Sequence, residues 1–553
     1  MKQYGTWLKR YAGWVLVLGF LCIHMLTIND FGLTWDYHFH FFGGGHFLGL
    51  SWQQLEPRAL PYVEPDPRFA WTLPYGPIMS IPPVVAFLLL YKTWHLLPPD
   101  SAYNLISILW GVAGIGILYI FMKQAVSSRV AILAALFLGL TPRYFGDIHN
   151  NMKDPPSAAV FALNMWLLWR LVQRKRPTDL FWAVLAFALA FNVKVNAIYI
   201  PVVFATWLLV THFSLTKLLN LLRFSKPFIW YVLLSPLAAF GLWAVFWQHP
   251  VAQLIQMYST FGIGTNNIEV LLNGHWYCSG STVPWYYPWW YLGITTPIPI
   301  LILFFTGLAT ILFNFQWMIF KKTHSSKIFH FPLYMLLLLW LFLPLTRYFI
   351  PTVGVIDGIR HFEEVLFPIA AIAAIGFDRI KPVRLMNYLA LLLSCYLLFT
   401  VFSYHPYQIT YFNELVGGVQ GAFGKYDLDY WGTSQKAAVS WVNAHAPQNA
   451  KISIVMAPDV AGTYLRPDLL TNLNKFSYDQ ADFVVMLNRQ SFYYRFFYAY
   501  EYLLRHTPAY TVRVHNTPLT WVFDNRTHNQ RVRQTPWWQG EDPCIRPYWK
   551  GVR

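Results

Sequence analysis

The sequence has little charge: of its 553 residues, 12% are Asp, Glu, Lys or Arg, about half the share of about 25% in an ordinary soluble domain. Hydrophobic residues make up 56% and aromatic residues 19%. This composition excludes a purely soluble protein, and so many aromatic residues exclude a disordered chain. What remains is a protein that crosses a membrane several times.

Cysteines are also few, and the common nucleotide-binding and hydrolase motifs are missing. The cysteines Cys22, Cys278, Cys395 and Cys544 form no Cys-x-x-Cys pair and no zinc-site spacing, which argues against a thiol redox centre or a zinc finger. There is no P-loop, no Gly-x-Gly-x-x-Gly after a strand and no Gly-x-Ser-x-Gly motif at the candidate site. A nucleotide donor and serine hydrolysis are therefore disfavoured.

Hydrophobic runs approach the length of a membrane span, which is about 20 residues. Eleven such runs lie at 11–28, 104–122, 129–146, 156–172, 180–194, 196–212, 228–247, 297–316, 331–348, 362–377 and 384–403. The sequence thus predicts a polytopic α-helical membrane protein with about eleven spans.

A further apolar run, 76–94, contains three prolines and needs the positive-inside rule to place it. Five basic clusters fall on one side of the membrane only if this run does not cross: Lys123 and Arg129; Arg170, Arg174, Lys175 and Arg176; Lys217, Arg223 and Lys226; Lys321, Lys322 and Lys327; Arg379, Lys381 and Arg384. We therefore predict a helix on the outer membrane surface here, and a tight hairpin turning at Lys194 on the same side.

The amino terminus is expected in the cytoplasm, because basic residues precede the first span. Residues 1–403 then form a transmembrane domain with two long outer loops, 29–103 and 248–296, and residues 404–553 form an extracytoplasmic α/β domain. The strands of this second domain are predicted from runs of alternating hydrophobicity at 451–455, 482–486 and 510–523. Cys278 and Cys544, the two cysteines predicted outside the membrane, are expected to form a disulfide.

Asp36, in the first outer loop, is the leading candidate for a general base. If this stretch is helical, His40 lies one turn further along the same face, where it can orient the carboxylate. The alternative is that Asp36 only caps the following helix. A metal site is disfavoured, because His38 and His40 do not share a helical face and no second carboxylate lies nearby.

Basic residues near the predicted outer ends of the spans are candidates for binding a phosphate: Arg143, Lys153, Lys194, Arg360 and His361. Ionisable groups at such positions usually mark function, and a guanidinium matches phosphate geometry. Asp154 is a candidate second carboxylate. The alternatives are ordinary flanking charge before a helix that begins at Pro155, and a surface ion pair between Asp357 and Arg360.

The aromatic loop 248–296 contains His275 and Trp276. It is either an interfacial belt of Trp and Tyr or a platform for a sugar ring or a prenyl chain. Together, these features indicate a site for a phosphate-bearing lipid. A multi-pass transporter is the main alternative, although the apolar runs carry almost no charge at their centres. A non-catalytic glycan-assembly protein is another, and no nucleic acid partner is expected.

Six stretches carry a resemblance to a known family: Thr34-Trp35-Asp36, Asn151-Met-Lys153-Asp154-Pro155, Lys194-Val-Asn196, Asp357-Gly-Ile-Arg360-His361, His405 to Asn413, and Asp427 to Gly432. In their order and topology, the chain resembles the C-type (GT-C) glycosyltransferases over its whole length. It is most similar to bacterial family-39-like proteins related to protein O-mannosyltransferases and lipid A aminoarabinose transferases. Asp429-Tyr-Trp-Gly432 is superficially similar to the acceptor-reading motif of oligosaccharyltransferases, but the order of residues differs.

The resemblance implies a GT-C fold and a hexosyl- or pentosyltransferase of the bacterial inner membrane. The sugar would pass with inversion from a polyprenyl-phosphate donor to a lipid, glycan or protein acceptor at the outer face, without cofactor or metal. Asp36 would be the base, and the basic residues named above would bind the donor phosphate, with His40, His275 and Trp276 in the donor and acceptor loops. Relatives commonly have an acidic pair in the first loop. Here Tyr37 follows Asp36, which leaves Asp36 as the sole base or moves the second carboxylate to Asp154.

Overall fold

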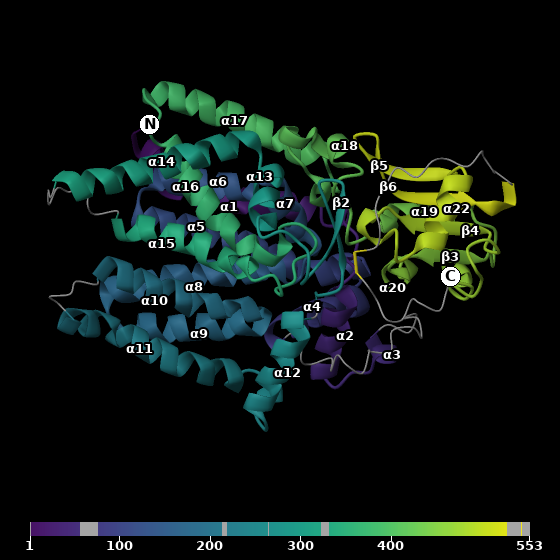
Figure 1. The fold of residues 1–553 in the computed structure, drawn as a ribbon, viewed down its shortest axis with the longest axis horizontal. Coiled ribbons are helices and arrows are strands. Elements are labelled where there is room, and N and C mark those ends of the chain that lie inside the picture. The colour runs from purple at the N-terminus through teal and green to yellow at the C-terminus, as the bar shows by residue number, and fades with distance from the viewer. Residues whose placement is uncertain are drawn as a thin grey trace.

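The structure, a computed structural model, describes residues 2–55, 76–212, 218–263, 265–321, 331–527 and 543–544. The basic residues Lys217, Lys322 and Lys327 of the topology prediction lie outside these ranges, as does the segment 56–75 of the first predicted outer loop. A bundle of long helices forms one end of the molecule, and a small sheet with short helices forms the other (Figure 1). Helix α1 begins at the far end of the bundle from that sheet.

Each of the eleven predicted runs contains a helix. These helices are α1 Lys2–Leu26, α5 Pro99–Ala125, α6 Ser128–Gly139, α8 Asp154–Arg174, α9 Pro177–Val193, α10 Tyr199–His212, α11 Leu218–Gly241, α14 Ile298–Lys321, α15 Phe331–Phe342, α16 Leu366–Phe377 and α17 Val383–Ser403. In the described ranges, four segments are long and apolar enough to cross a membrane: Pro99–Ala125, Ile298–Phe315, Phe331–Phe349 and Val383–Ser403. A fifth is added if α6 and α7 (Pro142–Asn150), bent by 67°, form one broken span. The count of eleven spans stays a prediction.

Helices α14 and α16 pack backbone against backbone. A Cβ atom on Gly376 would lie 2.2 Å from the carbonyl oxygen of Leu303, and one on Gly307 would lie 2.0 Å from that of Ile372. Small residues permit such close crossings between membrane helices. Helix α16 is buried along its whole length. The loop before it, which contains Arg360, therefore ends at a fixed point.

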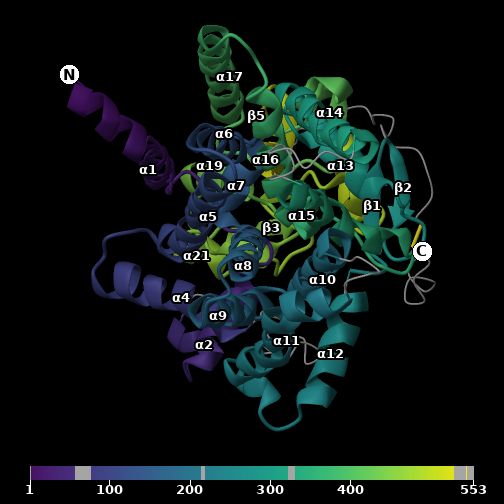
Figure 2. The same cartoon turned by 90° about the vertical axis from the view of Figure 1, so that its left-hand side faces the viewer.

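The proline-containing run at 76–94 is helical, as α4 Pro77–Ala86 followed by a π-helical turn, Phe87–Thr93. Pro82 and Pro83 lie inside α4 without ending it. The helix runs across the direction of the bundle (Figure 2) and packs against α2 (Tyr37–Phe47), α5 and α9. This direction agrees with a helix that does not cross with the others, and its place on a membrane surface remains a prediction.

The segments between the bundle helices hold short elements. After α9 the chain turns at Lys194 into a 3₁₀ turn, Val195–Ile198, and then α10, where the sequence predicts the hairpin. The remaining elements between bundle helices are α3 Trp52–Leu55, Ala244–Phe246 (3₁₀), α12 Pro250–Ile263, the hairpin β1 Glu269–Leu272 and β2 His275–Cys278, α13 Tyr287–Thr295, and the 3₁₀ turns Leu343–Phe349 and Arg360–Val365.

The residues after α17 form a four-stranded sheet of order β3-β4-β6-β5. Strands β3 and β4 are parallel and the other pairs are antiparallel. The elements are β3 Ile452–Val455, β4 Phe483–Leu487, β5 Tyr510–Val514, β6 Thr517–Asp524, α18 Gly418–Ala422, α19 Gln435–His445, α20 Pro458–Gly462, α21 Pro467–Leu470 and α22 Phe497–Arg505, with 3₁₀ turns at Gln408–Thr410, Glu414–Val416, Gln490–Phe492 and Asn525–Thr527. All three predicted strand runs contain strands. Val439 on α19 packs on one face of the sheet, and Leu503 on α22 packs on the other.

A disulfide joins Cys278, at the end of β2, to Cys544. It confirms the pairing expected from the sequence, and it ties the hairpin before α13 to the carboxyl-terminal segment. Cys22 and Cys395 are free and exposed.

We expect the same disulfide in native membranes. Proteolysis without reductant, followed by mass spectrometry, should recover the Cys278 and Cys544 peptides as one cross-linked species. Cys22 and Cys395 should carry the alkylating reagent and serve as internal controls. Alkylation of both Cys278 and Cys544 before any reductant is added would show that the bond does not form.

Candidate active site

The carboxylate of Asp36 is bound by two cations from distant parts of the chain. One of its oxygens, Oδ2, pairs with Nζ of Lys153 and lies 3.3 Å from Nη1 of Arg360. Asp36 occupies the N-cap position of α2, but its side chain makes no capping hydrogen bond. The alternative that Asp36 merely caps a helix is therefore wrong.

The segment before Asp36 is held against the residues that follow α17. The backbone N–H of Trp35 donates to the carbonyl of Trp431 at 3.0 Å, and that of Leu33 donates to the Tyr464 hydroxyl at 2.7 Å. The Thr34 hydroxyl donates to the carbonyl of Asn150 at 3.2 Å. Asp36 thus lies between the helical bundle and the residues after α17 that form the four-stranded sheet and its helices, which we call the sheet region.

Lys153 is fixed by a turn just before α8. The side-chain oxygen of Asn151 accepts from the backbone N–H groups of Lys153 and Asp154, at 3.2 and 3.0 Å. Pro155 stands in the first turn of α8, as predicted. The stretch 151–155 is therefore both a helix start and the support that directs Lys153 to Asp36.

Asp154, the candidate second carboxylate, is occupied by other groups. Its Oδ1 lies 2.7 Å from Nζ of Lys194, and its Oδ2 accepts from the Asn151 amide at 2.9 Å. The Asp154 side chain is completely buried, whereas that of Asp36 is 24% exposed. Lys194 also reaches the carbonyl of Arg360 at 3.4 Å. The pair thus joins the Lys194 turn to the Arg360 loop, and Asp36 is the more accessible acid.

Arg360 makes the ion pair with Asp357 that the sequence suggested as an alternative, at 2.7 Å. This pair is buried instead of lying on the surface, and it leaves Nη1 free to reach Asp36. The guanidinium also lies 4.7 Å from the ring centre of Trp431. Asp357 has a left-handed backbone, with φ of 57°, and Gly358 follows with φ of 68°. This tight turn aims both charged side chains inward.

Arg489 also belongs to the network, although it is not among the site residues predicted from the sequence. Its Nη2 lies 2.8 Å from Oδ1 of Asp357, and its Nη1 donates to the carbonyl of Tyr430 at 2.9 Å. It follows the carboxyl end of β4 by two residues. The one sequence signal that could have identified Arg489 is its place just beyond the apolar run of β4.

The charges around Asp36 decide its protonation. Burial by itself raises the pKa of the Asp36 carboxyl, but the nearby charges of Lys153 and Arg360 outweigh burial and hold the pKa below its usual value. Burial lowers the pKa of His40 to about 3. At neutral pH, Asp36 is therefore ionised and His40 is neutral.

The other predicted site residues make different contacts. Arg143 donates from Nε to the carbonyl of Tyr411 at 3.2 Å. His275 is exposed on β2, and the indole N–H of Trp276 donates to the carbonyl of Ser491 at 3.3 Å. His361 is partly buried beside Arg360, and its carbonyl accepts from the Asn196 amide at 3.0 Å. Within the described ranges, no ion pair links Arg143 or His275 to Asp36. Their roles remain predictions.

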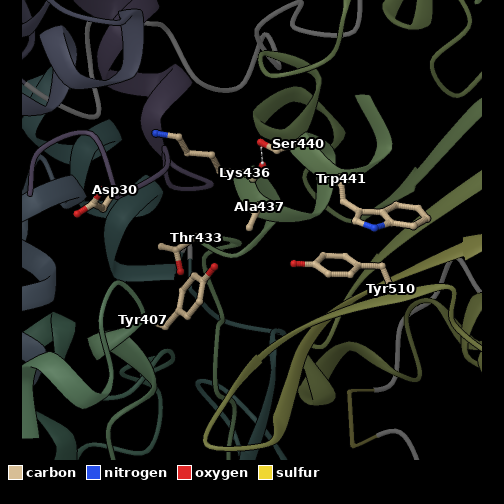
Figure 3. A pocket seen from close by; sticks show the side chains of 8 residues that line it. All are labelled: Asp30, Tyr407, Thr433, Lys436, Ala437, Ser440, Trp441 and Tyr510. Carbon is tan, nitrogen blue, oxygen red and sulfur yellow. Dashed lines mark hydrogen bonds between the residues drawn. The ribbon is translucent and has the colours of Figure 1, made fainter. Parts of the chain in front are cut away.

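A separate hollow of about 460 Å³ lies between Asp30 in the segment after α1, helix α19 and Tyr510 on β5 (Figure 3). Its lining residues are Asp30, Tyr407, Thr433, Lys436, Ala437, Ser440, Trp441 and Tyr510. The rings of Trp441 and Tyr510 stack in parallel, 5.4 Å apart. Lys436 donates to the carbonyl of Asn29 and pairs with Asp100, both at 2.7 Å. Lys436 thus holds the segment before Asp36 to the sheet region, and the hollow does not include the Asp36 network.

Among the described residues, no group of three or more His, Cys, Asp or Glu side chains is arranged to hold a metal ion.

Comparison with known families gives one match in sequence. Residues 80–247 match the family model described as dolichyl-phosphate-mannose-protein mannosyltransferase. The match confirms the predicted resemblance to this class of GT-C glycosyltransferases over a stretch that contains Arg143, Lys153, Asp154 and Lys194. No curated protein matches the sequence.

Solved structures also resemble the chain. ArnT from Cupriavidus metallidurans bound to undecaprenyl phosphate is 13% identical, with 93% of this chain and 98% of that chain covered and a TM-score of 0.49. Its apo state is 14% identical, with the same coverage and TM-score. The apo oligosaccharyltransferase of Archaeoglobus fulgidus is 12% identical, with 86% and 66% covered and a TM-score of 0.44.

The pair between Asp154 and Lys194 can be tested by mutation. Asp154→Asn leaves the largely buried Lys194 without its counter-ion, and breaking a buried pair in this way costs about 3–5 kcal/mol. We expect a clear fall in the Tm of the purified protein, partly restored by adding Lys194→Met. Asp30→Asn, at a carboxylate whose side chain is 48% exposed, is the control and should change the Tm little. A fall in Tm that Lys194→Met does not reduce would contradict the assignment of Asp154 to a structural pair.

Proposed function

We propose that this protein is an inverting membrane glycosyltransferase with Asp36 as its general base. It would move a sugar from a polyprenyl-phosphate donor to an acceptor at the outer face of a bacterial inner membrane. The observation that carries this proposal is one partly exposed carboxylate shared by two cations, Lys153 and Arg360. The match of residues 80–247 to a mannosyltransferase family model supports the class of reaction and a lipid-phosphate donor.

The positions of the charges favour an enzyme over a transporter. Lys153, Lys194 and Arg360 each lie between bundle helices or just before one. Ion pathways in transporters instead place ionisable groups near the bilayer midplane. The accessible carboxylate of Asp36 likewise favours catalysis over a purely structural glycan-assembly role.

The residues suit the chemistry of this transfer. A polyprenyl phosphate is a good leaving group once its charge is neutralised, so Lys153 and Arg360 would bind the phosphate oxygens and stabilise the departing anion. Asp36 would accept the proton of the acceptor hydroxyl or amine. The acceptor atom forms the new bond at the anomeric carbon, while the phosphate leaves from the opposite face with the bonding electrons. Inversion follows from this single displacement.

The shared cations suggest an order of events. In the free protein they hold the pKa of Asp36 below its usual value, and a carboxylate with a low pKa is a weak base. A donor phosphate bound to Lys153 and Arg360 would draw these cations away from Asp36 and raise its pKa towards the ordinary value. Donor binding would thus prepare the base before the acceptor reacts.

Asp36→Asn should abolish sugar transfer, because the amide cannot accept the proton. The assay uses purified protein in liposomes, a set of labelled polyprenyl-phosphate sugars, and envelope lipids and glycans as acceptors. Comparing surface glycans and lipids between wild-type and deletion strains by mass spectrometry selects the acceptor. Asp30→Asn, at an exposed carboxylate in the same loop, is the control and should keep activity. Unchanged transfer by Asp36→Asn at normal expression would refute the assignment of the base.

Lys153→Met and Arg360→Met should each weaken binding of polyprenyl phosphate. A hydrogen bond to a charged group contributes about 1.5–3 kcal/mol, which corresponds to roughly 10- to 100-fold in Kd. Direct binding of polyprenyl phosphate and of the acceptor should be measured for both variants. Arg129→Met serves as the control, because Arg129 forms an exposed pair with Asp378. Equal weakening of donor and acceptor binding would overturn the phosphate assignment.

A further inference from the structure

Arg489 lies outside the helical bundle, yet its guanidinium is buried in the candidate active site. It follows β4, and 5% of its side chain is exposed. Its two terminal nitrogens divide their contacts: Nη2 pairs with Asp357 and Nη1 donates to the carbonyl of Tyr430. A guanidinium with both terminal nitrogens engaged has a fixed orientation.

Asp357 joins two arginines through its two oxygens. Oδ1 lies 2.8 Å from Arg489, and Oδ2 lies 2.7 Å from Arg360. Arg360 in turn uses Nη2 for Asp357 and Nη1 for Asp36. The result is a continuous row of alternating charges, Arg489, Asp357, Arg360 and Asp36, in which each member sets the orientation of the next.

Arg489 also contacts the segment that carries Asp36. Its guanidinium lies 5.5 Å from the ring centre of Trp35, the residue before Asp36, and 3.8 Å from that of Phe492. The same side chain therefore touches the loop of the candidate base and the carboxylate that orients the candidate phosphate-binding arginine.

We propose that Arg489 is a positioning residue for glycosyl transfer: by holding Asp357, it directs Nη1 of Arg360 towards Asp36 and, once donor is bound, towards the phosphate. Because one oxygen of Asp357 is bound to Arg489, Asp357 cannot rotate to bind both terminal nitrogens of Arg360. One nitrogen of Arg360 therefore remains for the substrate. The sheet region would thus supply a residue that helps to complete the active site. This inference rests on the proposed function.

The test is a double-mutant cycle on transfer activity. Arg489→Met should lower kcat/KM for the polyprenyl-phosphate donor about 10-fold or more, because Arg360 loses its orientation. If Arg489 acts through Arg360, then Arg489→Met should cost little further activity in an Arg360→Met background. The same change should remain costly in a Lys153→Met background, because Lys153 is not part of the row. Arg489→Lys keeps the charge but makes fewer contacts, so an intermediate loss is expected.

The matched control is Arg495→Met. Arg495 also packs on Phe492, at 4.2 Å, but it pairs with Glu269 instead of Asp357. The activity losses from Arg495→Met and Arg360→Met should therefore be additive. The Tm of each variant separates lost activity from lost folding, and Arg489→Lys carries the same cycle if Arg489→Met cannot be purified.

Losses from Arg489 and Arg360 that are fully additive would overturn the positioning role. If Arg360→Met itself leaves transfer and donor binding unchanged, the proposed function fails instead. If Arg360→Met weakens donor binding as expected, but its activity loss simply adds to that of Arg489→Met, only this inference fails and the proposed function stands.

Discussion

The carboxylate of Asp36 holds together parts of the chain that are distant in sequence. Lys153 comes from the turn before α8, Arg360 from the loop before α16, and Asp36 from the segment after α1. Two cations on one oxygen make a strong local attraction where part of the site is shielded from water. In the same arrangement, an anionic substrate can compete with Asp36 for both cations.

The bundle supplies fixed points for these loops. Helix α16 is anchored by its close crossing with α14 at Gly307 and Gly376, and Lys194 connects its own turn to Asp154 and to the Arg360 loop. Charged side chains are costly in the hydrocarbon core of a bilayer. Helix ends and connecting turns are therefore where a membrane protein can gather several ionisable groups at low cost, and the network lies there.

Part of the site could be predicted from sequence because its residues stand out locally. Asp36, Lys153, Lys194 and Arg360 are ionisable residues beside apolar runs, and the structure brings them together. The partners were not predictable. Whether Asp154 is a second base or the counter-ion of Lys194 depends on packing, and Arg489 meets Asp357 across 132 positions. The helical runs were predicted from hydropathy, and α4 continues through Pro82 and Pro83 while it packs against α2, α5 and α9.

The most direct test is an experimental structure of the protein with polyprenyl phosphate bound. We expect the phosphate to lie within hydrogen-bonding distance of both Nζ of Lys153 and Nη1 of Arg360, Asp36 to be released from at least one of them, and the Arg360–Asp357–Arg489 contacts to persist. A phosphate bound elsewhere, with the Asp36–Lys153 pair intact, would show that these two cations do not bind the donor.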